Sequence, residues 1–202
     1  MLLLVAVTGC KDREATRSEP PPLPTLKIAG VYPDKWQCDS VATLAALEQV
    51  LGGPVTQREA TAALPPGLPQ PCNYEVQASG LELWTFDLDC RDGMKQRADA
   101  LFAQYQATSQ ELVEQYARLR DAGAGKPSDA GPPPHPPEPA AEVAVGARGL
   151  DHHGQGLLFI DDDAPCYVRV VGTDAARRLA LARLIAKNLT FENAPMVPRA
   201  AR

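Results

Sequence analysis

Apolar and polar residues alternate along two short runs between residues 72 and 90, a pattern typical of half-buried β-strands. The apolar positions are Cys72, Tyr74, Val76 and Ala78 in the first run, and Trp84, Phe86, Leu88 and Cys90 in the second. A three-residue loop at 78–80 places Tyr74 opposite Trp84 and unites the two apolar rows on one face, whereas a two-residue turn separates them. The pattern therefore predicts a hairpin with Tyr74 opposite Trp84.

Helical spacing of apolar residues predicts three helices. After Cys38, Ser40 can cap a helix that ends at Gly52-Gly53-Pro54. Asp92 opens a long second helix, and Thr173 caps a third that runs through Leu189. We expect one buried stripe on the second helix, formed by Met94, Ala98, Leu101, Phe102, Tyr105, Leu112, Tyr116 and Leu119. In the third, we expect Leu181, Leu184, Ile185 and Leu189 to face the core, and Arg177, Arg178, Arg183 and Lys187 to face mostly solvent.

Further short strands are indicated at 143–145, 157–160 and 166–171. The order is therefore a helix followed twice by strand–strand–helix. This order predicts an α+β fold: an antiparallel sheet built from two strand–strand–helix halves, with the helices packed on one face. We expect a single domain over 36–192, a disordered proline-rich insertion over 122–141, a flexible tether over 11–35 and a tail over 193–202.

Charge narrows the classes of partner. The 202-residue chain has a net charge of -5, a pI near 5.2 and no run of Lys or Arg. Nucleic-acid binding requires a concentrated basic surface, so nucleic acid is not an expected partner.

The first residues, MLLLVAVTGC, run from an apolar stretch through small residues to Cys10, and a polar, proline-rich tract follows. This segment resembles the bacterial lipoprotein signal, in which an apolar or small triplet precedes a cysteine that is diacylated and becomes the mature N-terminus. Here the triplet is Val7-Thr8-Gly9. The resemblance implies that residues 1–10 are a signal segment, that Cys10 is the lipidation site, and that the membrane is a partner through the acyl chains. No Lys or Arg precedes the apolar run, and the run is shorter than a normal signal core. A start codon further upstream would explain both departures.

Without Cys10, four cysteines remain: Cys38, Cys72, Cys90 and Cys166. An even number in an exported chain indicates two disulfides, with three possible connectivities. We favour Cys38–Cys72, which would tie the first helix to the first strand, and Cys90–Cys166, which would link the two halves on the side of Trp84. No C-x-x-C spacing occurs, so a zinc ribbon or a thioredoxin-like site has no support.

Three segments, CDSVATLAALEQVLGG, PCNYEV and the Ala-rich last helix, resemble a family of actinobacterial lipoproteins of unknown function. In that family an early cysteine-containing helix leads to a hairpin that begins with cysteine, and then to a second sheet-and-helix half. The resemblance implies no catalytic residue.

The segment DHHGQGLLFIDDDAPC concentrates residues that could carry chemistry. Asp151, His152 and His153 are the candidate ligand-binding residues, and with 161–163 they could in principle bind a metal. Neighbouring residues of an extended segment point to opposite sides, so His152 and His153 can hardly share one ion. We therefore interpret 161–165 as a hairpin turn whose carboxylates accept local amide protons, and we predict no metal site.

No nucleophile motif, P-loop or dinucleotide fingerprint occurs, so we predict neither an enzyme nor a cofactor. We expect a membrane-anchored envelope lipoprotein whose domain is a binding or structural module, with an envelope protein or a small ligand as partner. In Gram-negative bacteria, an Asp directly after the acylated cysteine usually retains a lipoprotein in the inner membrane. Lys11 occupies that position here, which favours the outer membrane in such a cell. We expect the domain to lie in the periplasm or at the cell surface. The alternatives are a periplasmic enzyme or metal-binding protein that uses 151–153, and a secreted protein that is not acylated.

Overall fold

The computed structural model of the chain describes residues 30–60, 63–78, 80–123 and 138–197. The predicted signal segment with Cys10, most of the predicted tether, the centre of the predicted insertion (124–137) and the end of the tail (198–202) lie outside the described residues.

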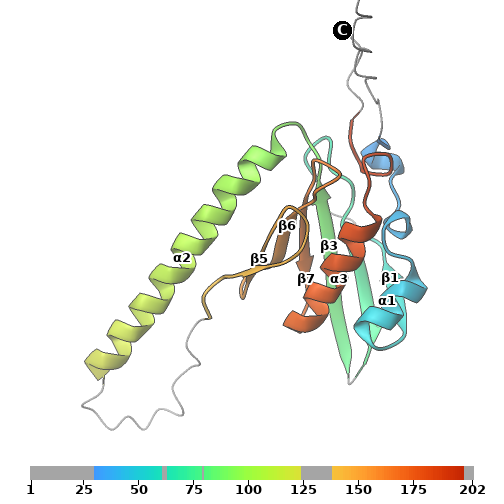
Figure 1. Cartoon of the computed structure of the whole chain (residues 1–202). Coiled ribbons are helices and arrows are strands. Elements are labelled where there is room, and N and C mark those ends of the chain that lie inside the picture. The colour runs from blue at the N-terminus through green and yellow to red at the C-terminus, as the bar shows by residue number, and fades with distance from the viewer. Residues whose placement is uncertain (1–29, 61–62, 79, 124–137, 198–202) are drawn as a thin grey trace, which may run out of the picture.

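Seven antiparallel strands form one sheet in the order β1-β2-β3-β7-β6-β5-β4 (Figure 1). The strands are β1 Val55–Arg58, β2 Cys72–Gln77, β3 Leu81–Asp89, β4 Ala141–Val143, β5 Arg148–His152, β6 Gly156–Ile160 and β7 Tyr167–Val171. The helices are α1 Leu44–Leu51, α2 Met94–Gly123 and α3 Ala175–Asn188, with short 3₁₀ turns η1 Pro33–Lys35 and η2 Cys38–Ser40. The predicted α+β class with an antiparallel sheet is confirmed.

A three-stranded meander, β1-β2-β3, and a four-stranded meander, β4-β5-β6-β7, meet where β3 pairs with β7. Helix α2 follows the first meander and α3 follows the second. The predicted register of the first hairpin is confirmed, because Tyr74 lies opposite Trp84. The sequence analysis did not predict β1 or β5, so the first half has three paired strands before its helix and the second half has four.

The larger core lies between the inner face of the sheet and helices α1 and α3 (Figure 1). Alternate residues of β3 and β7, among them Trp84, Phe86 and Val170, point into it. Leu47 and Leu51 of α1 and Leu181 and Ile185 of α3 cover them. The alternation of β3 thus fixes which face of the sheet is buried.

Helix α2 packs on the other face of the sheet, so the expectation that all helices share one face does not hold for it. Met94, Ala98 and Phe102 contact a second, smaller core that includes Leu158 and Ile160 of β6. Every residue of β6 is buried, because α3 covers one of its faces and α2 the other. Its sequence, GLLFI, has no polar alternation, which is typical of a strand covered on both sides.

Only the first turns of α2 reach the sheet. Leu112 is 46% exposed and Leu119 is 66% exposed, so the predicted stripe is buried at its start and not at its end. In Figure 1 the later turns of α2 extend away from the sheet. A 30-residue helix is about 45 Å long, which is more than the width of the three strands that it could cover.

The helix caps lie later in the chain than predicted. The Thr43 side chain accepts a hydrogen bond from the Ala46 amide and caps α1, whereas Ser40 lies in η2. Asp174, not Thr173, caps α3 by accepting from the Arg177 amide. The end of α1 is as predicted, since Gly52 adopts the left-handed conformation (φ 78°) that glycine tolerates best.

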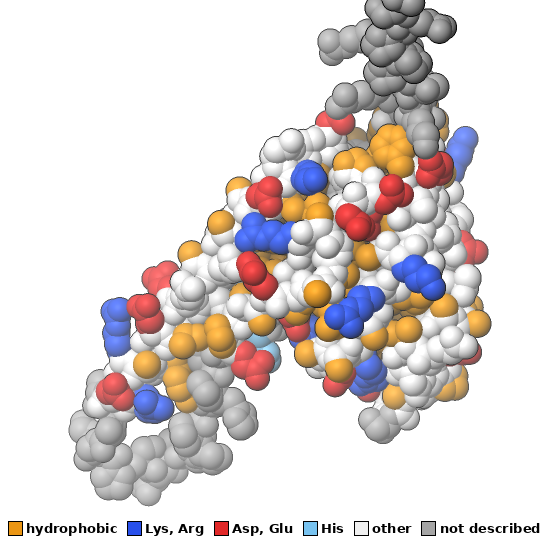
Figure 2. Space-filling view, in the orientation of Figure 1, with side chains coloured by type: hydrophobic (Ala, Val, Ile, Leu, Met, Phe, Trp, Pro, Cys, Tyr) orange, Lys and Arg blue, Asp and Glu red, His pale blue; other side chains and the backbone are white. Residues whose placement is uncertain are grey.

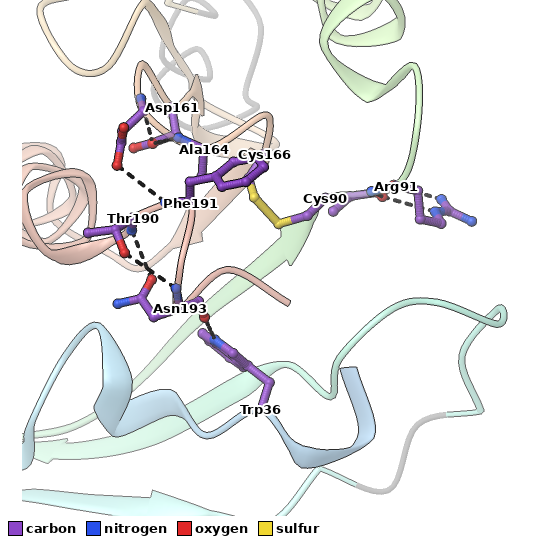
Figure 3. The surroundings of a disulfide bond; sticks show 11 residues. Trp36, Cys90, Arg91, Asp161, Ala164, Cys166, Thr190, Phe191 and Asn193 are labelled. Atoms are coloured by element: carbon purple, nitrogen blue, oxygen red, sulfur yellow. Dashed lines mark hydrogen bonds and ion pairs between the residues drawn. A yellow bond between two sulfur atoms is a disulfide. The ribbon is translucent and has the colours of Figure 1, made fainter. Parts of the chain in front are cut away.

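Both favoured disulfides are confirmed. Cys38–Cys72 ties η2 to the start of β2, with 5.8 Å between the Cα atoms. Cys90–Cys166 joins the end of β3 to the start of β7, and Figure 3 shows it beside the turn that holds Asp161. Each cysteine of the four is buried.

The packed domain extends beyond 36–192 on both sides. The Val31 amide donates to the Ala194 carbonyl, and the Trp36 indole donates to the Asn193 carbonyl (Figure 3). Ala194 and Met196 are buried, so the start of the predicted tail belongs to the core. The predicted insertion is narrower than 122–141, because α2 ends at Gly123 and β4 begins at Ala141.

Removal of either disulfide should destabilise the domain, and removal of Cys90–Cys166 should cost more. The bonds close loops of 34 and 76 residues, and the loop-entropy account gives about 4 kcal/mol for each, slightly more for the longer loop. Urea denaturation of the double variants C38A/C72A and C90A/C166A measures both losses against the oxidised wild type. Equal stability of wild type and both variants would contradict the bracing role, and fully reduced wild type is the control.

Candidate functional site

The predicted ligand-binding residues do not converge. Asp151 and His152 lie on β5, and successive strand residues point to opposite faces. Asp151 faces Arg178 of α3, whereas the His152 ring lies 5.6 Å from the Tyr105 ring of α2. His152 Nδ1 also accepts a hydrogen bond from the Gly154 amide, and His153 is exposed in the turn that follows. The segment therefore does not form one site.

Asp151 and Arg178 form a buried ion pair that attaches α3 to β5. Arg178 Nη2 donates to both carboxylate oxygens at 3.0 and 2.9 Å, and Nη1 donates to the Gly172 carbonyl at 2.8 Å. Arg178 is 8% exposed, so the prediction that it faces solvent was wrong. Multiple hydrogen bonds between a guanidinium and a carboxylate satisfy both charges and allow the pair to be buried.

The 161–165 segment is the predicted turn between β6 and β7. Asp161 Oδ1 accepts from the Asp163 and Ala164 amides, and Asp163 Oδ2 accepts from the Phe191 amide (Figure 3). Asp161 Oδ2 is buried without a hydrogen-bond partner among the described residues. Burial raises the pKa of this carboxyl to about 6, and the neighbouring charges of Asp162 and Asp163 add to the rise.

In the described part of the chain, no group of three or more His, Cys, Asp or Glu side chains is placed to hold a metal ion.

A groove on the outer side of the sheet is the best candidate site. We call it the α2 groove: it lies between the first turns of α2, strands β3 and β7, and the proline-rich loop 64–71. Its volume is about 470 Å³, within the usual range for small-molecule sites. Leu64, Leu68, Met94 and Leu101 supply apolar walls. The groove exists because α2 covers only the second meander and leaves the outer face of β3 open.

Two aspartates in the α2 groove are neutralised by arginines. Arg169 donates to Asp87 across the β3–β7 pair at 2.9 Å, and Arg91 forms two hydrogen bonds with Asp89 at 2.9 and 2.6 Å. Burial raises the pKa of Asp87, and the charge of Arg169 opposes that rise. The carboxylates are therefore largely occupied within the protein.

Three further polar groups line the α2 groove: the guanidinium of Arg97 and the hydroxyls of Tyr105 and Tyr167. Burial raises the pKa of Tyr167 well above its usual value, so this phenol keeps its proton. The chemistry on offer is hydrogen-bond donation and positive charge beside an apolar wall. Among the described residues that line the groove there is no histidine, serine or cysteine.

Comparison with protein-family models, curated proteins and solved structures finds no match to this chain. Within the described residues, none of the helices combines the length and the apolar character needed to cross a membrane.

Sequence reasoning missed the α2 groove. The groove depends on the pairing of β7 with β3, which brings Arg169 beside Asp87. One signal was present: Arg97 is three residues after Met94 and four before Leu101, so a cation interrupts an apolar helical stripe. Positively and negatively charged side chains are interspersed on the face in Figure 2.

Asp151→Ala should destabilise the domain by about 3–5 kcal/mol, because it leaves the Arg178 charge buried without its partner. His153→Ala, at an exposed position, should stay within about 0.5 kcal/mol of wild type. The double variant D151A/R178M should recover part of the loss. Chemical denaturation measures all three, and a loss of similar size in Asp151→Ala and His153→Ala would contradict the structural role.

The free energy of unfolding should fall as the pH rises from about 4 to 6, because over this window the folded state keeps the Asp161 proton that the unfolded state has lost. The fall amounts to roughly 2–3 kcal/mol, since a tenfold change in proton affinity corresponds to about 1.4 kcal/mol. Asp161→Asn should remove this component of the pH dependence, and Asp34→Asn, at an exposed position, should retain it. Urea denaturation at pH 4, 5, 6 and 7 tests this; parallel curves for wild type and Asp161→Asn would refute it.

Proposed function

We propose that this protein is an exported lipoprotein, held at a membrane of the cell envelope by acyl chains on Cys10. The observation that carries the proposal is the cysteine pairing. Four of the five cysteines close two disulfides in the described domain, and Cys10 is the fifth. Stable disulfides are typical of proteins outside the reducing cytosol. The triplet before Cys10, Val7-Thr8-Gly9, is of the apolar or small kind that precedes the cysteine in such a signal.

We further propose that the domain is a non-enzymatic binding module. Asp151, the first residue of the predicted site, is occupied by the ion pair with Arg178, which argues against a catalytic role for that segment. The α2 groove supplies a concave surface of suitable size with donors and apolar walls, which supports binding. With Lys11 after the acceptor cysteine, we propose the outer membrane as the address if the cell is Gram-negative.

Cys10→Ala, made in the native gene, should move most of the protein from the membrane fraction to the soluble fraction, because attachment depends on burial of acyl methylenes. An inhibitor of the lipoprotein signal peptidase should make the wild type accumulate as a larger precursor. Ser18→Ala, also in the predicted N-terminal segment, is the matched control and should remain in the membrane fraction. A Cys10→Ala variant that fractionates like wild type would refute the lipid anchor.

A further inference from the structure

The α2 groove contains more donors than acceptors. Arg97 forms no ion pair with a described residue, and the hydroxyls of Tyr105 and Tyr167 form no hydrogen bond with one. The carboxylates of Asp87 and Asp89 already accept from Arg169 and Arg91. Three arginines and two aspartates line the groove, so its formal charge is +1.

The three donors, Arg97, Tyr105 and Tyr167, lie on two elements, α2 and β7. Arg97 and Tyr105 lie on α2 two turns apart, on the same face as Met94 and Leu101. Tyr167 begins β7, where it pairs with Asp89 of β3. The ring centroids of Phe102 and Tyr167 are 6.2 Å apart, and the Arg148 guanidinium lies over the Phe102 ring. These contacts hold α2, which carries Arg97, against β7, which carries Tyr167.

Guanidinium and phenol groups that are free to donate recognise oxyanions, because charge-assisted hydrogen bonds to carboxylate or phosphate oxygens are the strong ones. The groove also has an apolar part: Leu68 of the proline-rich loop lines it together with Met94 and Leu101 of α2. A ligand that matches both the donors and the apolar side chains has an acidic head and an apolar body.

We propose that the α2 groove binds a small organic anion, with its carboxylate or phosphate head on Arg97, Tyr105 and Tyr167 and its apolar body against Leu68, Met94 and Leu101. This inference rests on the binding role proposed above and specifies its ligand class. It does not depend on the lipid anchor, because the groove belongs entirely to the folded domain.

The fluorescent probe 1-anilinonaphthalene-8-sulfonate, which joins an acidic head to an aromatic body, tests the site on the full chain with both disulfides closed. It should bind saturably with one probe per chain. Arg97→Gln should weaken binding by about tenfold, since a hydrogen bond to a charged group contributes about 1.5 kcal/mol or more. Arg118→Gln, on the exposed later turns of α2, is the matched control and should bind like wild type.

A neutral probe, N-phenyl-1-naphthylamine, separates the head from the body. Leu101→Asp should weaken both probes, whereas Arg97→Gln should weaken the sulfonate alone. Octanoate and octyl phosphate should compete with the sulfonate, and the stronger competitor identifies the head group. Circular dichroism and thermal unfolding of each variant check that it is folded.

Unsaturable or multiple binding of the sulfonate, equal binding by Arg97→Gln and wild type, or no competition by either octyl anion would overturn the proposal. Each of these results can occur while Cys10→Ala still releases the protein from the membrane, so failure of the ligand site and failure of the anchor are distinguishable.

Discussion

The pairing of β3 with β7 is the contact on which the rest of the structure depends. It joins two strands whose paired residues are about 80 positions apart in the chain, and closing so long a loop is entropically costly. The Cys90–Cys166 disulfide continues the same ladder by one register position after the Asp89–Tyr167 pair. The bond thus holds the two halves in the register that places Phe86 opposite Val170 in the main core. Without the β3–β7 pairing, α2, which follows the first meander, could not cover β6 of the second meander. The α2 groove, which β3 and β7 line together, could not form either.

The β3–β7 pairing also determines which side chains lie together on each face of the sheet. On the inner face, apolar residues of both halves are sealed by α1 and α3. On the outer face, the same register sets Arg169 beside Asp87 and brings Tyr167 under α2. Helix α2 covers the second meander only. The α2 groove lies beside the helix, over β3 and β7, and is lined by charged and apolar side chains. The position of the α2 groove is therefore set by nonlocal contacts of a disulfide-braced sheet.

Local pattern predicted the elements with the strongest periodicity. Tyr74 and Trp84 share a face because strand alternation leaves one workable register, and Gly52 ends α1 because few residues tolerate its backbone. Sequence reasoning failed where tertiary contacts decide. Arg178 belongs to a charged helical face by spacing, but Asp151 of β5 draws it inside. The groove was missed because it needs the β3–β7 pairing and the position of α2, which no local pattern contains.

Two disulfides brace the fold, and we propose that the chain acquires them on export from the cell interior. The most direct test is non-reducing peptide mass mapping of the protein isolated from its own cells. We predict an acylated Cys10 peptide together with two linked pairs, Cys38 with Cys72 and Cys90 with Cys166. Free thiols at these four positions with an unmodified Cys10 would contradict the account.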